Sequence, residues 1–137
     1  MMAGSWKFVK EKDMMYEEAF GRVHYWHYHP EIIKGADSYM VKVVMPEGGG
    51  HNFHVHPEMN EILYILKGTA EQWIEGEMQI LHAGDSVYID ANVGHGTFNA
   101  GKGKLEFLAI LSPPEGWEAG TVDVSSEEPY ISYRKPI

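Results

Sequence analysis

Two histidines separated by one residue stand out among the side chains that could do chemistry. His54 and His56 lie in a run of strand-forming residues that ends at Pro57. Side chains on a strand alternate between its faces, so the two imidazoles point the same way, with Cα atoms about 6.6 Å apart. That separation suits two ligands of one metal ion. Taken alone, the pair is weak evidence, because two surface histidines beside a glycine-rich loop would look the same.

Two later residues extend the pair to a group of four. Glu61 opens the strand that follows the loop 57–60, so its side chain is free to match the face of the histidines. His95 begins another short strand after a glycine-containing turn. Three imidazoles and one carboxylate form a borderline-hard donor set that suits Mn, Fe, Co, Ni or Zn. The chain has no Cys, which excludes disulfide scaffolds, Cys-based zinc sites and thiol nucleophiles.

Four polar residues near this group are candidates for contact with a substrate. Asn52 and His51 lie two and three residues before the first histidine of the pair. Gln72 is predicted to face the interior from its strand, where a buried amide needs partners. Thr97 shares the strand phase of His95. The alternative for Asn52 and His51 is that they are ordinary loop residues, which contact the backbone or solvent.

The elements that must position these residues are short strands. Glycine-rich turns such as 48–50 and 100–103 separate them, and no strand alternates with a long helix. Many short strands at regular spacing favour a β-sandwich or barrel. One short helical turn is expected at 13–20. The predicted strands are 23–28, 38–45, 51–56, 61–66, 69–74, 78–81, 86–89, 94–98 and 105–111.

Length and charge narrow the classes of function. A chain of 137 residues predicts a single domain. The 20 acidic and 11 basic side chains give a net charge of -9, which disfavours nonspecific binding to nucleic acid or anionic membranes. No apolar run approaches the roughly 20 residues of a membrane helix, and the first residues lack the apolar segment of a secretory signal. We therefore expect a cytoplasmic protein with no nucleic-acid or membrane partner.

The spacing of glycines and candidate ligands resembles the first motif of the cupin superfamily. The pattern reads Gly48-x5-His54-x-His56-x4-Glu61-x6-Gly68 and matches that motif at every defined position.

The second cupin motif follows after a short spacer, as in small single-domain cupins. Here it reads Gly84-x5-Asp90-x-Asn92-x2-His95-x3-Asn99. Asp90 stands where Pro is usual and Asn92 where Gly is usual. Both departures fall in a turn, where Asp and Asn are favourable, and the histidine at the ligand position is kept.

The resemblance implies an all-β fold, the double-stranded β-helix or jelly-roll cupin barrel. It implies an N-terminal strand or arm at 1–37, the barrel with both motifs at 38–112, and a tail packed on the barrel at 113–137. It also implies one divalent transition metal (Fe, Mn, Ni, Co or Zn) near one mouth of the barrel. The implied ligands are His54, His56, Glu61 and His95.

The resemblance further implies a small-molecule ligand or substrate and a homodimer. Small cupins often exchange N-terminal strands, so the aromatic run 24–29 is expected to be exposed or to lie at a dimer contact. A dioxygenase-like reaction is the first expectation, because such cupins use three His and one Glu, and an isomerase or lyase is the next. The alternative is a non-catalytic module that binds or senses a sugar or small organic acid. Nucleophile-elbow, P-loop and dinucleotide patterns do not occur in the sequence.

Overall fold

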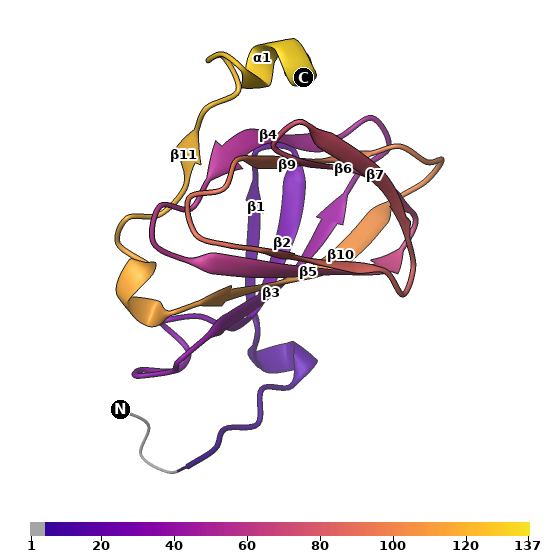
Figure 1. The fold of residues 1–137 in the computed structure, drawn as a ribbon. Coiled ribbons are helices and arrows are strands. Elements are labelled where there is room, and N and C mark those ends of the chain that lie inside the picture. Colours follow the sequence, from indigo (N-terminus) through magenta and orange to yellow (C-terminus); the bar gives the residue numbers. More distant parts are fainter. Residues whose placement is uncertain (1–4) are drawn as a thin grey trace.

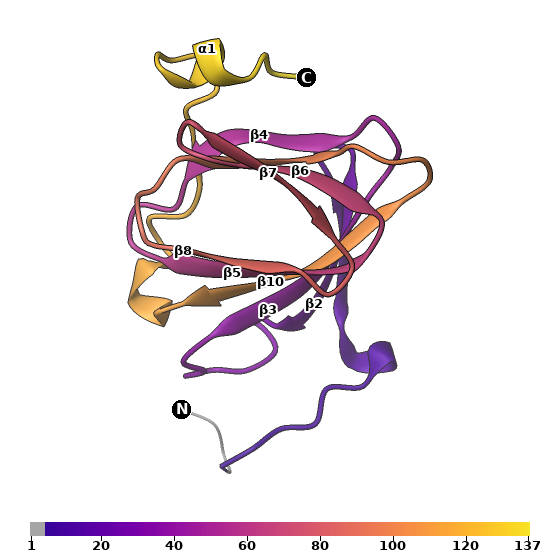
Figure 2. The same ribbon diagram turned by 45° about the vertical axis from the view of Figure 1, so that its right-hand side comes forward.

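The computed structural model describes residues 5–137 and shows two antiparallel sheets that face each other (Figure 1, Figure 2). In order across the first sheet, the strands are β1 (Met15–Ala19), β2 (Arg22–Tyr28), β3 (Tyr39–Met45), β10 (Leu105–Ser112), β5 (Asn60–Lys67) and β8 (Ser86–Ile89). The second sheet contains β11 (Val122–Asp123), β4 (Gly50–Val55), β9 (His95–Asn99), β6 (Thr69–Ile74) and β7 (Glu77–His82). The predicted all-β jelly-roll fold is confirmed.

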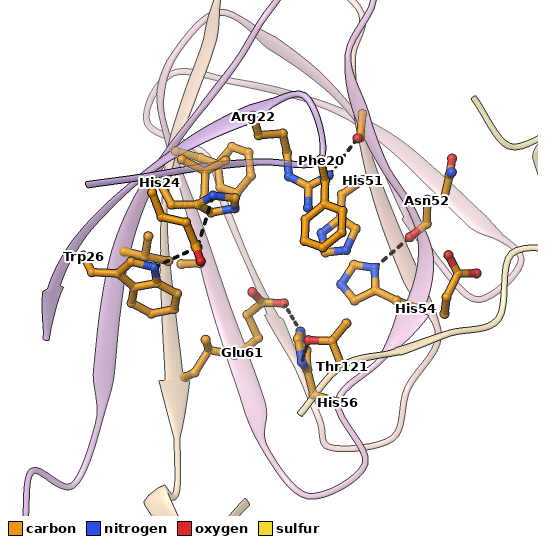
Figure 3. Close-up of a pocket in the computed structure, with 18 of the residues that line it drawn as sticks. Phe20, Arg22, His24, Trp26, His51, Asn52, His54, His56, Glu61 and Thr121 are labelled. Carbon is orange, nitrogen blue, oxygen red and sulfur yellow. Dashed lines mark hydrogen bonds and ion pairs between the residues drawn. The ribbon is translucent and has the colours of Figure 1, made fainter. Parts of the chain in front are cut away.

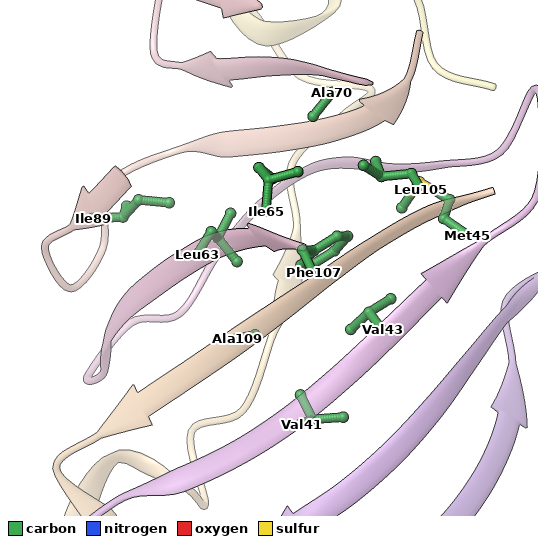
Figure 4. Packing of buried hydrophobic residues seen from close by; sticks show 10 residues of the cluster. All are labelled: Val41, Val43, Met45, Leu63, Ile65, Ala70, Ile89, Leu105, Phe107 and Ala109. Atoms are coloured by element: carbon green, nitrogen blue, oxygen red, sulfur yellow. The ribbon is translucent and has the colours of Figure 1, made fainter. Parts of the chain in front are cut away.

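The core fills the space between the sheets and follows the alternation of the strands. Every second residue of β3 and of β10 is buried, and the residues between them are half-buried. Side chains of alternate residues point to the same face of a strand, so each strand contributes one apolar row to the interior. Figure 4 shows ten of these residues, which are Val41, Val43, Met45, Leu63, Ile65, Ala70, Ile89, Leu105, Phe107 and Ala109.

The N-terminal segment differs from the sequence-based prediction. The helical turn expected at 13–20 is wrong, because Met15–Ala19 forms β1 and pairs with β2 through the two-residue turn Phe20–Gly21. A weak local helix preference loses to pairing with a neighbouring strand. The aromatic run 24–29, expected to be exposed or to lie at a dimer contact, falls largely in β2, between β1 and β3, and its side chains are half-buried. A dimer contact there stays a prediction.

The turn before β9 shows how the sequence accommodates its departure from the second motif. Asn92 has φ 64°, the left-handed conformation that glycine adopts easily and that asparagine tolerates better than most residues. Its backbone N–H donates to the carbonyl of His56 at 2.8 Å. Asn92 therefore permits the same turn as the usual glycine, and its hydrogen bond connects the turn to the residue that follows β4.

The C-terminal segment runs along the second sheet. A 3-10 helix (Pro114–Gly116) precedes β11, which pairs with the edge of β4, and α1 (Tyr130–Tyr133) follows (Figure 1). Tyr130 and Tyr133 pack on Phe53, and the ring of Tyr133 also stacks on that of Trp73. The outward side of β4 and β6 is thus covered by the chain itself. None of the helices among residues 5–137 is long and apolar enough to cross a membrane.

Two isoleucines on opposite faces of β5 test this arrangement. Ile65 is fully buried, whereas Ile62 is 38% exposed. We expect Ile65→Ala to lower the free energy of unfolding by about 2–5 kcal/mol, because it leaves a cavity in the core. The matched control Ile62→Ala should cost about 1 kcal/mol or less. Urea denaturation measures both, and equal losses would contradict the assigned faces.

Candidate metal centre

The four candidate ligands converge from two sheets. His54 lies in β4, His56 directly follows that strand, and His95 begins β9 of the same sheet, while Glu61 comes from β5 of the facing sheet. One ligand atom from each residue lies within 4.8 Å of those of the other three, and all four side chains are buried. Figure 3 shows how the two strands bring three of them, His54, His56 and Glu61, to one side of a cavity.

The three imidazoles are held through one ring nitrogen each. His54 Nδ1 donates to the carbonyl of Asn52 at 2.7 Å, and His95 Nδ1 donates to the carbonyl of Val93 at 2.9 Å. The hydroxyl of Thr121 lies 3.2 Å from His56 Nδ1. Contacts at the far nitrogen are how proteins orient metal-binding histidines, and here they leave each Nε2 for the shared centre.

Glu61 carries the negative charge of the group. Its Oε1 accepts a hydrogen bond from His95 Nε2 at 2.8 Å and lies 3.4 Å from His56 Nε2. Burial alone would raise the pKa of Glu61, but the His56 and His95 imidazoles outweigh it and hold the pKa far below its usual range. Burial also opposes the charge on His95, yet the bond to Glu61 and its charge raise the pKa of that imidazole.

Two ring nitrogens show that the group is suited to a cation. His56 Nε2 is buried and makes no hydrogen bond, which is costly for a polar atom without water. Burial lowers the pKa of His54 well below its usual range, so this imidazole stays neutral with a lone pair to offer. A metal ligand must be deprotonated in this way. The donor set fits a borderline divalent cation.

A β-bulge in β4 places one further histidine beside the group. His51 pairs with Thr97 and His54 pairs with His95, so Asn52 and Phe53 together oppose one residue of β9. The extra residue cancels the strand alternation between His51 and His54, whose rings stack with centroids 3.5 Å apart and planes at 8°. Burial, followed by the charge of Arg22, lowers the pKa of His51 well below its usual range.

Asn52, another residue predicted to contact a substrate, lines the cavity and also bonds to the backbone of Ile137. Its Oδ1 accepts from the Ile137 backbone N–H at 3.0 Å, and its Nδ2 donates to the Ile137 carbonyl at 3.3 Å. His51 lines the cavity too. A role of either residue in binding a substrate stays a prediction.

Gln72 and Thr97 lie in the interior, as their strand phases predict, but they contact each other. The Thr97 hydroxyl donates to Gln72 Oε1 at 2.6 Å, and Gln72 Nε2 donates to the carbonyl of Trp73 at 3.3 Å. Both side chains are buried, and neither is among the residues that line the cavity. The pair satisfies its own polar groups, so contact with a substrate stays a prediction for these two.

A cavity of about 740 Å³ opens onto the metal-ligand candidates (Figure 3). One wall is apolar and comes from β3 and β10, with Val41, Val43, Phe107, Ala109 and Leu111. Another comes from the hairpin β1–β2, with Glu17, Phe20, Arg22, His24 and Trp26.

The hairpin wall is the part of the site that sequence reasoning missed. Arg22, His24 and Trp26 alternate along β2 and so share one face. That alternation was the available signal. It does not say which face points inward, which depends on pairing with β3.

The family comparison agrees with this geometry. The family described as "Cupin domain" matches residues 41–111, about half of the chain. The chain belongs to the cupin family. It is 31% identical over 90 residues to an uncharacterized protein, MJ1618, of Methanocaldococcus jannaschii, covering 66% of this chain and 72% of that one. It is 33% identical over 70 residues to an oxalate-binding protein of Thermotoga maritima, covering 51% and 58%.

Longer proteins and a solved structure are also similar to this cupin. It is 30% identical over 96 residues to a mannose-1-phosphate guanylyltransferase of Escherichia coli, covering 66% of this chain but only 20% of that enzyme. The solved structure of a predicted oxalate decarboxylase from Thermotoga maritima superposes with a TM-score of 0.70 at 23% identity, covering 78% of this chain and 99% of that one. At that identity, the likeness shows the shared fold.

The Gln72–Thr97 pair allows a test of its structural role. Thr97→Val keeps the shape but leaves Gln72 Oε1 buried without its donor, so we expect a loss of about 1–3 kcal/mol in the free energy of unfolding. The double variant Gln72→Met, Thr97→Val removes both partners and should be more stable than Thr97→Val alone. Denaturant unfolding of the wild type, of Thr97→Val, of Gln72→Met and of the double variant measures this. A double variant that loses the sum of both single effects would contradict the pairing.

Proposed function

We propose that this cupin binds one divalent transition metal through His54, His56, Glu61 and His95. The observation that carries the proposal is the convergence of the four buried donor atoms within 4.8 Å of one another. The hydrogen bonds at the three Nδ1 atoms and the unpartnered Nε2 of His56 support it. Fe, Mn, Ni, Co and Zn all suit this donor set.

We further propose that the metal serves a reaction on a small organic molecule in the adjoining cavity. A bound divalent cation would act as a Lewis acid that polarises an oxygen of the substrate. Side chains of the barrel would form the rest of the reaction site. Val43, Phe107 and Leu111 give an apolar wall, which would exclude water. A dioxygenase-like reaction is the first choice and an isomerase or lyase the second.

A non-catalytic binding module is the second candidate. Similarity to a protein named for oxalate binding favours it, as does the pairing of Gln72 with Thr97, which leaves fewer polar groups to act on a substrate. Such a module needs only a shaped, polar cavity and no turnover.

We also propose a homodimer, with the N-terminal arm 1–37 as the contact. Residues 1–4 of that arm lie outside the described residues. Within it, Trp6 and Phe8 are 72% and 81% exposed. Sedimentation should give a mass near twice 15.5 kDa, and Trp6→Ser with Phe8→Ser should shift it toward the monomer. A monomeric wild type would contradict the proposal.

The metal assignment is tested by elemental analysis. We expect close to one metal per chain in the purified wild type and a loss of most of it in the double variant His54→Ala, His56→Ala, because two of the four ligands are gone. His82→Ala is the matched control, since His82 is exposed and lies away from the group. Equal metal content in the wild type and the double variant would refute the assignment.

Turnover separates the enzyme from the binding module. The Fe-loaded protein should consume O₂ in the presence of at least one member of a panel of small diols, diketones and phenols, and Glu61→Gln should abolish that consumption. An isomerase or lyase would instead form product without O₂ uptake. Saturable binding with neither uptake nor product, measured by oxygen electrode and chromatography, would favour the binding module.

A further inference from the structure

Arg22 is a buried cation whose charge no carboxylate of the described chain balances. It opens β2, lies outside the residues that match the family, and is 7% exposed. Its Nη1 donates to the carbonyl of Gly50 at 3.1 Å. Among residues 5–137, none of the ion pairs includes its guanidinium. Arginine is almost never buried unless it is paired, so this guanidinium lacks the anionic partner that a buried arginine usually has.

Two aromatic neighbours share the cavity wall with Arg22. The guanidinium lies 5.6 Å from the centroid of the Phe20 ring, a cation–π contact. His24 is two residues further along the same face of β2, and its Nδ1 is buried without a hydrogen bond. Its nearest acidic atom is Glu17 Oε1, at 3.6 Å. All four side chains line the cavity.

Phe20 occupies a backbone position that its side chain disfavours. Its φ is 55° in the two-residue turn to Gly21, where Asn or Gly is preferred. A bulky residue in this conformation is an outlier, and such outliers concentrate at functional sites. The ring is 85% exposed although it borders the cavity. Holding an aromatic ring over the guanidinium accounts for a residue that the turn alone would not select.

We propose that Arg22 binds a carboxylate of the substrate, on the side of the cavity away from Glu61 and His56. Figure 3 shows Arg22 and those two ligand candidates on different sides of the cavity. A planar carboxylate matches the fork of a guanidinium with two hydrogen bonds. This proposal deepens the proposed function, in which the metal site would hold a second oxygen of the same molecule, while Arg22 by itself would select the carboxylate.

The charges and walls around Arg22 favour a monocarboxylate with an apolar body. Arg22 is the one arginine or lysine among the described residues that line the cavity, and Glu17 and Asp123 line it in addition to the metal-ligand candidate Glu61. With Glu61 assigned to the metal, two further carboxylates and one cation remain on the walls, and this balance disfavours a phosphate dianion. The apolar side chains of β3 and β10 would contact a hydrocarbon portion between the carboxylate and the second oxygen.

The test compares keto acids with their uncharged amides. Pyruvate, levulinate and phenylpyruvate, each paired with its primary amide, are titrated by calorimetry into the metal-loaded wild type. We expect at least one acid to bind about 10- to 100-fold more tightly than its amide, as a charged hydrogen-bond pair predicts. Arg22→Gln, which retains a donor for the Gly50 carbonyl, should lose that preference while its metal content stays unchanged. Lys42→Gln is the matched control, because Lys42 is a cation outside the cavity.

Repeating the titrations after EDTA treatment separates this proposal from the metal site. The preference for the acid should persist in the metal-free wild type, because it comes from Arg22. A preference that disappears with the metal, or that survives in Arg22→Gln, would overturn the proposal. A wild type that binds none of the acids more tightly than its amide would also overturn it.

The variant Phe20→Asn keeps Arg22 but removes the aromatic ring that covers the guanidinium. This variant should raise the thermal stability of the protein and lower its affinity for the acid several-fold. An unchanged affinity would overturn the role of Phe20.

Discussion

A buried carboxylate from one sheet that meets three imidazoles from the other is the constraint on which this structure depends. Glu61 and its histidine neighbours must be desolvated together, and a buried ion pair rarely repays that cost with net stability. The barrel therefore has to hold the group in place by other contacts. Backbone carbonyls of Asn52 and Val93 orient two imidazoles, and the turn at Asn92 bonds to the carbonyl of His56.

The sequence was sufficient to predict the fold and the grouping of the four side chains. Short strands with glycine-rich turns leave few architectures for 137 residues, and two spaced motifs restrict them further. The same-face geometry of His54 and His56 follows from strand alternation alone. Glu61 could be joined to them because the loop before it resets the phase, and the structure brings all four together. Asn92 departs from the family pattern but still permits the turn, because asparagine tolerates the positive φ that the turn requires.

The rest of the site depends on pairing between distant strands, which local patterns do not encode. A bulge at Asn52 and Phe53 stacks His51 on His54, whereas an unbroken strand would have turned it away. The hairpin β1–β2 brings Arg22 to the cavity, although the aromatic sequence that follows Arg22 resembles that of an exposed strand. Burial patterns identify which residues are inside, but which polar groups bond to each other is decided by the register of the sheets.

A crystal structure of the zinc-loaded protein, with data collected on both sides of the zinc absorption edge, would locate the ion directly. We expect one strong anomalous peak per chain, about 2.0–2.2 Å from an imidazole nitrogen of His54, His56 and His95 and from a carboxylate oxygen of Glu61. A peak at another position, or one that leaves two or more of these four side chains uncoordinated, would contradict it.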